Sequence, residues 1–260
     1  MISIYTTGFN LEKININFDE VFSNWLVYAN EIVLSTFQDE IKTTVDIISK
    51  SKFYDSGKIK VVGLKVDIEN DVYWEGKLKN FALENCTNSV VLQCDLDERV
   101  SGDPKHFEVC RRSILDHDFS CSVMLPTMDL YEDLDHYINL GKKWYLHTKE
   151  GTFRGSVNWA RKEDGSLDPE KSDTCELIDA KGNLIPCIAN VEYSSNDYPK
   201  IIHLGYLDLD KKNCVNEFWG KIWNHRSSGS FDPEYKMEKV TSGDPRKKKH
   251  NLSKPLWPTL

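Results

Sequence analysis

The sequence predicts a doubly wound α/β fold with a mainly parallel central sheet and a second half of mixed strand direction. Two observations support this fold class. The first hundred or so residues alternate between short β-prone runs and stretches whose apolar residues recur at helical spacing. The run at 90–94 is apolar enough to be buried on both faces, as strands of parallel sheets usually are. Strict alternation of strand and helix implies βαβ units with right-handed crossovers.

The expected strands of this first part are residues 2–6, 31–35, 59–66 and 90–94. A helix is expected after Asn17, which can cap its first turn, with Glu20 completing a partial capping box. A short helix around 41–48 and a longer one from about 74 to near Asn85 fill the other gaps between strands.

Beyond residue 100 the pattern changes. We expect a helix near 107–115, strands at 120–125 and 144–147, long loops over 152–186, and a helix whose Trp219 and Trp223 face the core. From Ser227 the chain is polar and poorly patterned. With no repeat or linker in view, the chain divides into two halves of one domain, 1–126 and 127–226, and a polar tail, 227–260.

The composition is that of an ordinary globular protein, with 40% hydrophobic and 28% charged residues. A net charge of −8 argues against a broad electrostatic grip on nucleic acid. No apolar run is long enough to span a bilayer, and the N-terminus does not resemble a signal peptide. Seven cysteines without C-x-x-C spacing indicate reduced thiols. Together these features predict a cytoplasmic protein.

Polar side chains follow the predicted strands at the edge where such sheets bind ligands. Thr6 and Thr7 end the first strand, Asp39 follows the second, and Asp95 and Asp97 follow the fourth. Side chains two residues apart on an extended chain point the same way, so we expect the last two carboxylates to lie together. A hard divalent cation, Mg²⁺ or Mn²⁺, would relieve their repulsion and could also bind a diphosphate.

Over residues 1 to 126 the chain resembles the GT-A glycosyltransferases, especially those of family 2. The resemblance rests on the helix residues 76–86, with an N-x-A-L core, which run into the strand ended by D-x-D. It implies a Rossmann-like GT-A fold that binds a nucleotide-sugar in the first half and an acceptor in the second. The residues implied for donor binding are Thr6, Thr7, Asp39, Lys77 and Asp95, with Asp95 and Asp97 as metal ligands. Only part of the family's pattern after the second strand is kept at 35–39.

The second half must supply a general base for the acceptor hydroxyl. We favour Asp173 or Glu176, which follow a glycine-rich, aromatic stretch, over Glu132 or Asp133. The resemblance implies inversion and a late histidine that completes the metal shell. His203 is the candidate, and a core histidine is its alternative. For His147 and Arg154 we expect structural or solvated roles, and contact with phosphate or sugar hydroxyls is the alternative. The acceptor would be a saccharide, a glycan or a lipid-linked molecule, and the basic run at 246–250 allows at most peripheral membrane contact.

The leading hypothesis is therefore metal-dependent glycosyl transfer from a nucleotide-diphosphate-sugar to a hydroxyl. A nucleotidyltransferase is an alternative, although the chain lacks a glycine-rich phosphate loop after the first strand. A dehalogenase-like phosphatase also carries D-x-D, but Arg99 stands where that family prefers Thr or Val. A protein that binds carbohydrate or nucleotide-sugar without catalysis also fits this sequence.

Overall fold

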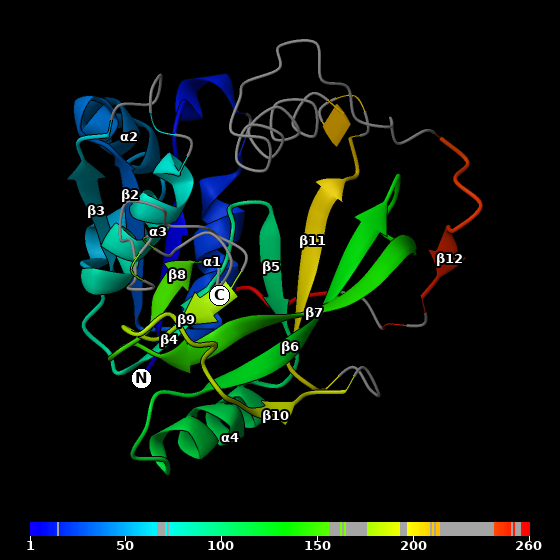
Figure 1. Ribbon diagram of the computed structural model, residues 1–260. Helices are drawn as coiled ribbons and strands as arrows, with labels where there is room; N and C mark the ends of the chain where they lie inside the picture. Colours follow the sequence, from blue (N-terminus) through cyan, green and yellow to red (C-terminus); the bar gives the residue numbers. More distant parts are fainter. Residues whose placement is uncertain are drawn as a thin grey trace.

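The structure is a computed structural model that describes residues 1–14, 16–66, 71, 73–155, 162, 164, 176–192, 197–208, 210, 212, 213, 242–250, 252 and 256–260. Its centre is a sheet with the strand order β3-β2-β1-β4-β7-β6-β11-β5 (Figure 1). The first four strands of this order are parallel: β1 (Ser3–Thr7), β2 (Glu31–Phe37), β3 (Ile59–Leu64) and β4 (Val90–Gln93).

The other half of the sheet has mixed strand directions. β7 (His136–Thr148) runs antiparallel to both β4 and β6 (Ser122–Tyr131), and β11 (Lys200–Tyr206) runs parallel to β6. β5 (Glu98–Ser101) closes the edge antiparallel to β11. β10 (Cys187–Asn190) pairs with β6 and β12 (Lys248–Lys249) with β7, while β8 (Phe153–Gly155) and β9 (Glu176–Ile178) form a separate pair. The expected fold class, mainly parallel first and mixed later, is confirmed.

Helices cover both faces of the sheet. They are α1 (Phe18–Tyr28), α2 (Ile41–Ile48), α3 (Trp74–Glu84) and α4 (Pro104–Leu115), with single 3₁₀ turns at Leu11–Lys13, Gln38–Glu40 and Tyr54–Ser56. Alternate residues of β1, β2 and β4 divide between two apolar clusters, as the two-residue period of a strand requires. One cluster joins Ile4, Leu34 and Leu92 to α1, α2 and α4. The other joins Tyr5, Val33 and Val91 to α3.

Most of the elements expected in the first half are present, with boundaries within two residues. Asn17 caps α1 as expected: its side chain accepts a hydrogen bond from the backbone N–H of Glu20 at 3.3 Å. The strand expected at 120–125 overlaps the longer β6, which begins at Ser122, and the strand expected at 144–147 is part of the longer β7. The expectation of loops alone over 152–186 was wrong, because β8 and β9 lie there. The expected helix with Trp219 and Trp223 lies outside the described residues.

The last residues of the chain pack onto the core. Leu256 is buried in a cluster with Met128, Leu130 and Ile202, and its carbonyl oxygen accepts a hydrogen bond from the Ser101 hydroxyl at 2.6 Å. The side-chain amide of Asn24 donates to the carbonyl oxygen of Pro258 at 2.8 Å. Among the helices that the structure describes, none combines the length and apolar character needed to cross a membrane.

Candidate active site

The candidate site lies at the carboxyl ends of β1 and β4. β1 lies between β2 and β4, so the strand order reverses at this point and leaves the crevice in which open α/β sheets bind ligands. Asp95 and Asp97 follow β4. We had expected an extended chain between them, but the chain forms a turn here. The backbone N–H of Glu98 donates to the carbonyl oxygen of Asp95 at 2.8 Å, which closes a turn. Each carboxylate therefore has its own set of partners.

Asp95 forms an ion pair with a buried lysine. The Lys79 ammonium, on α3, lies 2.9 Å from Asp95 Oδ1 and 3.2 Å from a carboxylate oxygen of Glu75. The Gln93 amide donates to the same Oδ1 at 2.9 Å. Burial raises the pKa of Asp95, but the charges of Lys79 and Lys143 and the hydrogen bond from Lys79 together lower it by more, so the pKa lies below its ordinary value and Asp95 is ionised at neutral pH.

Asp97 faces a histidine on the neighbouring strand. β5 and β11 pair so that Glu98 lies opposite His203, and the backbone N–H of Leu204 donates to the carbonyl oxygen of Asp97 at 2.8 Å. This pairing brings His203 Nε2 to 3.2 Å from Asp97 Oδ2, while His203 Nδ1 lies 2.7 Å from Asp129 Oδ1 on β6. The Asp97 side chain is 51% exposed, so it remains open to a ligand.

The ring of His203 is held as a cation. Desolvation lowers the pKa of His203, but Asp97 and Asp129 raise it to about 10. Desolvation raises the pKa of Asp97, but the charge and the hydrogen bond of His203, together with the charge of Lys212, lower it by more, to well below its ordinary value. A cation bound between Asp97 and Nε2 would take the place of the proton on Nε2, since metal ligation needs neutral imidazole.

Gly205 keeps the space between these two side chains open. A Cβ at this position would lie 2.6 Å from His203 Nε2 and 3.1 Å from Asp97 Oδ2. Only a glycine therefore fits here without displacing the imidazole ring.

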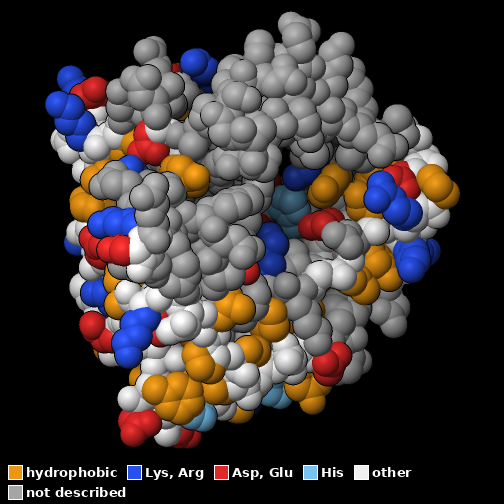
Figure 2. Space-filling model, viewed as in Figure 1, with side chains coloured by type: hydrophobic (Ala, Val, Ile, Leu, Met, Phe, Trp, Pro, Cys, Tyr) orange, Lys and Arg blue, Asp and Glu red, His pale blue; other side chains and the backbone are white. Residues whose placement is uncertain are grey.

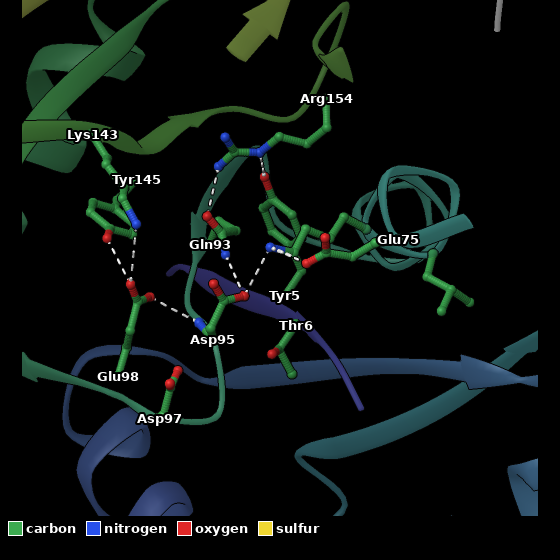
Figure 3. A network of polar contacts seen from close by, with 12 residues as sticks. Tyr5, Thr6, Glu75, Gln93, Asp95, Asp97, Glu98, Lys143, Tyr145 and Arg154 are labelled. Atoms are coloured by element: carbon green, nitrogen blue, oxygen red, sulfur yellow. Dashed lines mark hydrogen bonds and ion pairs between the residues drawn. The ribbon is translucent and has the colours of Figure 1, made fainter. Parts of the chain in front are cut away.

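A buried carboxyl group lies immediately behind the turn. Glu98 is 1% exposed, accepts a hydrogen bond from the Tyr145 hydroxyl at 2.7 Å, and accepts a second one from the backbone N–H of Asp95 at 2.9 Å (Figure 3). Lys143 Nζ lies 3.8 Å from the same carboxyl group. Burial raises the pKa of Glu98 above its ordinary value despite Lys143. These contacts fix the shape of the Asp95–Glu98 turn.

A chain of buried polar groups extends from Asp95 into the sheet (Figure 3). The side-chain oxygen Oε1 of Gln93 accepts from the Arg154 guanidinium at 3.0 Å, and Arg154 Nε donates to the Tyr5 hydroxyl at 3.0 Å. The Tyr5 hydroxyl lies 2.8 Å from His147 Nε2, and His147 Nδ1 donates to the carbonyl oxygen of Thr148. This donor order makes His147 the neutral Nδ1–H tautomer. Burial, reinforced by Arg154, lowers the pKa of His147 to about 3. The structural roles expected for His147 and Arg154 fit this placement.

Thr6 carries an unpaired hydroxyl at the edge of the site. The end of β1 lies beside the start of the turn, because the backbone N–H of Cys94 donates to the carbonyl oxygen of Tyr5 at 3.2 Å. Thr6 Oγ1 is the one buried side-chain oxygen or nitrogen of the described residues that has no hydrogen-bond partner. Figure 3 shows this hydroxyl turned toward the Asp95–Asp97 turn. Buried polar groups are normally satisfied, so a bound ligand would complete its hydrogen bonding. Thr7, the last residue of β1, is partly buried.

The other donor-binding candidates lie further from the turn. Asp39 is exposed in the 3₁₀ turn after β2, at the ligand-binding edge but outside the contacts described above. Lys77 forms an ion pair with Asp71 at 2.8 Å. The helix residues behind the family resemblance contribute differently: Lys79 holds Asp95, and the Asn80 amide exchanges hydrogen bonds with the backbone of Arg154 at 2.7 and 3.0 Å.

The candidate bases occupy different surroundings. Asp173 lies outside the described residues. Glu176 begins β9 and pairs with Gly155, next to Arg154 on β8. Glu132 has a left-handed backbone (φ 62°) and accepts hydrogen bonds from Gly243 and Lys247, and Asp133 contacts His136 and Lys247. The contacts of Glu132 and Asp133 anchor the segment 242–247 to the turn between β6 and β7.

The residues present would fit a divalent cation held through few protein ligands. No group of three or more His, Cys, Asp or Glu side chains within the described ranges is arranged as a complete metal site. Asp97 and His203 Nε2 are the pair that converges, with Asp129 holding the other ring nitrogen as carboxylates do behind histidine ligands. Mg²⁺ and related ions commonly take one or two protein ligands and complete their shell with phosphate oxygens and water.

Sequence reasoning missed Lys79, Asp129, Glu98 and Tyr145. Lys79 alone had a local signal, since it lies four residues after Glu75 and faces the strand that D-x-D ends. Glu98 directly follows Asp97 in the sequence. Asp129 and Tyr145 reach the site through the pairing of β5, β6, β7 and β11, which the sequence pattern does not specify.

Fold and site together define an α/β protein of the Rossmann-like class with an acidic, histidine-containing site at the carboxyl ends of its parallel strands. No protein-family model matches the sequence, and no curated protein matches it. Among solved structures, the chain is similar to residues 1–349 of S. aureus TarS, with 20% identity and a TM-score of 0.32 over 51% of this chain and 36% of that one. The same fragment in complex with UDP-GlcNAc aligns with 20% identity and a TM-score of 0.32 over 50% and 34% of the two chains.

A further similar structure is the 4-diphosphocytidyl-2C-methyl-D-erythritol synthase of Anaerococcus prevotii DSM 20548. The identity is 12% and the TM-score 0.34, over 56% of this chain and 69% of that one. The chain spans about a third of the length of the TarS fragment, and each likeness covers about half of the chain.

Proposed function

We propose that the chain is a divalent-cation-dependent glycosyltransferase that moves a sugar from a nucleotide-diphosphate-sugar to an acceptor hydroxyl. The observation that carries the proposal is the half-exposed Asp97 carboxylate facing His203 Nε2 at 3.2 Å, at the ligand-binding edge of the sheet. The resemblance of residues 1–126 to GT-A glycosyltransferases supports the same reading. The cation is Mn²⁺ or Mg²⁺, and Mn²⁺ suits the imidazole ligand better.

The residues of the turn have separate roles. Asp97 and His203 hold the cation, which when bound offsets the charge on the leaving nucleoside diphosphate. Asp95 is held through Oδ1 by Lys79 and Gln93, so its Oδ2 faces the donor. The Thr6 hydroxyl donates to the bound nucleotide-sugar, which satisfies its open hydrogen bond.

The acceptor is a saccharide, a glycan or a lipid-linked molecule, and its hydroxyl loses a proton to Asp173 or Glu176. Inversion at the anomeric carbon follows from the family resemblance. The anomeric configuration of a transferred sugar, read by NMR, tests it directly.

The test of the proposal compares the wild type with alanine substitutions of two glycines. Calorimetric titration of UDP, UDP-GlcNAc and other nucleotide-sugars, with and without Mn²⁺, measures binding, and release of free sugar measures donor hydrolysis. We expect Mn²⁺-dependent binding in the wild type and at least a tenfold loss in Gly205→Ala, because the added Cβ displaces His203. Gly141→Ala is the matched control, since a Cβ there meets no atom within 4 Å.

Three experimental outcomes would contradict the proposed activity or replace it with another. Failure of every nucleotide-sugar to bind in the presence of Mn²⁺ would contradict it. Release of pyrophosphate from a nucleoside triphosphate would reassign the site to nucleotidyl transfer. Tight binding of a nucleotide-sugar without hydrolysis or transfer would indicate a binding protein.

A further inference from the structure

Two lysines outside the predicted donor and metal residues flank the Asp95–Asp97 turn. The first is Lys143, in the middle of β7, whose side chain is 59% exposed. Its Nζ lies 5.5 Å from the ring centroid of Tyr145 and 3.8 Å from the Glu98 carboxyl group, beyond hydrogen-bond distance. Figure 3 shows Lys143 and Tyr145 on the same side of Glu98. The hydrogen bonds from Tyr145 and from the Asp95 backbone already satisfy Glu98.

The second is Lys212, which follows β11. Its Nζ lies 4.4 Å from the centroid of the Tyr206 ring, and that ring packs edge to face on the ring of His203 at 5.8 Å. Burial lowers the pKa of Lys212, whereas Asp97 and Asp129 raise it. Lys212 therefore lies in the electrostatic field of the histidine-binding carboxylates.

The two ammonium groups lie near the same residues. Lys143 Nζ is 3.8 Å from Glu98, which lies opposite His203 in the pairing of β5 with β11. Lys212 lies over the Tyr206 ring, which packs on the ring of the same histidine. Figure 2 shows a hollow on this face in which a histidine side chain is visible, with Lys or Arg and Asp or Glu side chains around it. The Lys143 charge disfavours the charge on Lys212, and an anion beside both ammonium groups would reduce this repulsion.

The other positive charges of the region are committed to carboxylates. Lys79 is buried against Asp95 and Glu75, and His203 lies between Asp97 and Asp129. Lys143 forms a longer ion pair, 3.8 Å from the Glu98 carboxyl group. Lys143 and Lys212 both contact the faces of aromatic rings, and such contacts leave N–H groups able to donate. Ammonium groups that can donate toward a shared hollow are suited to phosphate oxygens.

We infer that Lys143 and Lys212 form a diphosphate-binding site that acts without the divalent cation. The diphosphate belongs to the nucleotide donor or product if the proposed function holds, and the inference rests on that function for the identity of the nucleotide only. The site gives the leaving group a second source of positive charge beside the cation at Asp97 and His203.

The experiment measures binding of inorganic pyrophosphate in EDTA, at low salt, by calorimetry. We expect the wild type to bind, and Lys143→Met and Lys212→Met each to lose about tenfold in affinity, the loss expected for one charge-assisted hydrogen bond. Lys60→Met is the matched control. It removes the same charge from the opposite end of the sheet, where Lys60 contacts Asn85. Lys143→Arg should retain most of the affinity, and thermal melting checks that each variant is folded.

A second titration, of UDP with Mn²⁺, separates this inference from the proposed function. Equal pyrophosphate affinity of the wild type and the two methionine variants in EDTA would overturn the inference, as would a wild type that does not bind pyrophosphate. Mn²⁺-dependent UDP binding would then still support the proposed function. Lysine-dependent pyrophosphate binding without any Mn²⁺-dependent nucleotide binding would support the site and count against glycosyl transfer.

Discussion

At the scale of single residues, His203 shows how the site is organised. Both of its ring nitrogens face carboxylates, Nδ1 at 2.7 Å from Asp129 and Nε2 at 3.2 Å from Asp97. The Asp129 side chain is 15% exposed, so this carboxylate is shielded while Asp97 is open. Asp129 therefore sets the orientation of the ring, and Asp97 is the partner of His203 that is exposed enough to meet a ligand.

Replacing Asp129 should weaken cation binding without unfolding the protein. In Asp129→Asn we expect Mn²⁺ affinity to fall by about 10- to 100-fold, the usual effect of removing a carboxylate that orients a histidine ligand. Calorimetry or the electron paramagnetic resonance signal of free Mn²⁺ measures this directly. Asp46→Asn, at an exposed position of α2, is the control for a lost surface charge. Unchanged Mn²⁺ affinity in Asp129→Asn would remove His203 from the proposed ligand set.

The residues with a local signature were the predictable ones. Asp95 and Asp97 are recognisable because they end an apolar strand, and His203 because glycine follows it two residues later. Asp129 and Tyr145 have no such signature, since each reaches the site only through strand neighbours distant in the sequence. The prediction that Asp95 and Asp97 lie on an extended chain failed because Glu98 closes a turn onto Asp95.

At the scale of elements, β7 joins the two halves of the sheet. It pairs with β4 at one end and with β6 along most of its length. His147, near its end, is fully buried and contacts Tyr5 on β1, two strands away in the sheet order. A neutral imidazole therefore forms part of the connection between the parallel and the mixed halves.

His147 should make stability depend on pH. Its folded-state pKa of about 3 lies below the ordinary value of 6.5, so the unfolded chain binds the proton more readily. The stabilising effect is complete above about pH 6.5 and is lost as the pH falls toward 3. When the pH is lowered from 7 to 5, the titration of His147 alone lowers the free energy of unfolding by about 2 kcal/mol.

Urea unfolding of the wild type and of His147→Gln at both pH values measures this contribution. The glutamine variant should be less stable at pH 7 but should lose about 2 kcal/mol less between pH 7 and pH 5. Parallel pH profiles for the two proteins would show that His147 is not held neutral.

Elements with their own apolar pattern were predictable, and elements that depend on neighbours were not. α1 has both a cap and an apolar stripe, and its predicted start at Asn17 is confirmed. β5 has the sequence Glu-Arg-Val-Ser, yet all four residues are buried. The pairing of β5 with β11 and its contact with α1 bury these polar residues, and neither feature is visible in the local sequence.

At the scale of the whole molecule, the end of the chain helps to close the core. Residues 256–260 have no apolar periodicity, yet Leu256 is 6% exposed, and Ser101, Asn24 and Ser23 bind the backbone of this segment. The last residues thus cover the edge formed by α1 and β5.

Leu256→Ala should therefore destabilise the fold by about 2 to 3 kcal/mol, as the truncation of a buried leucine does. Leu134→Ala removes the same atoms at a position that is 41% exposed and should change stability little. Denaturant midpoints of the two variants test this difference. Equal midpoints would mean that residues 256–260 do not contribute to the core.

Two adjacent residues of α3 hold separate parts of the molecule. Lys79 reaches Asp95 after β4, and Asn80 exchanges hydrogen bonds with the backbone of Arg154 on β8. Because α3 contacts both, it fixes the distance between the Asp95–Glu98 turn and the small β8–β9 sheet that carries Glu176. A one-residue insertion before Lys79 would rotate both side chains by about 100° and detach the turn and the small sheet together. Evolution can therefore change the length of the helix before Lys79 only by rebuilding both attachments at once.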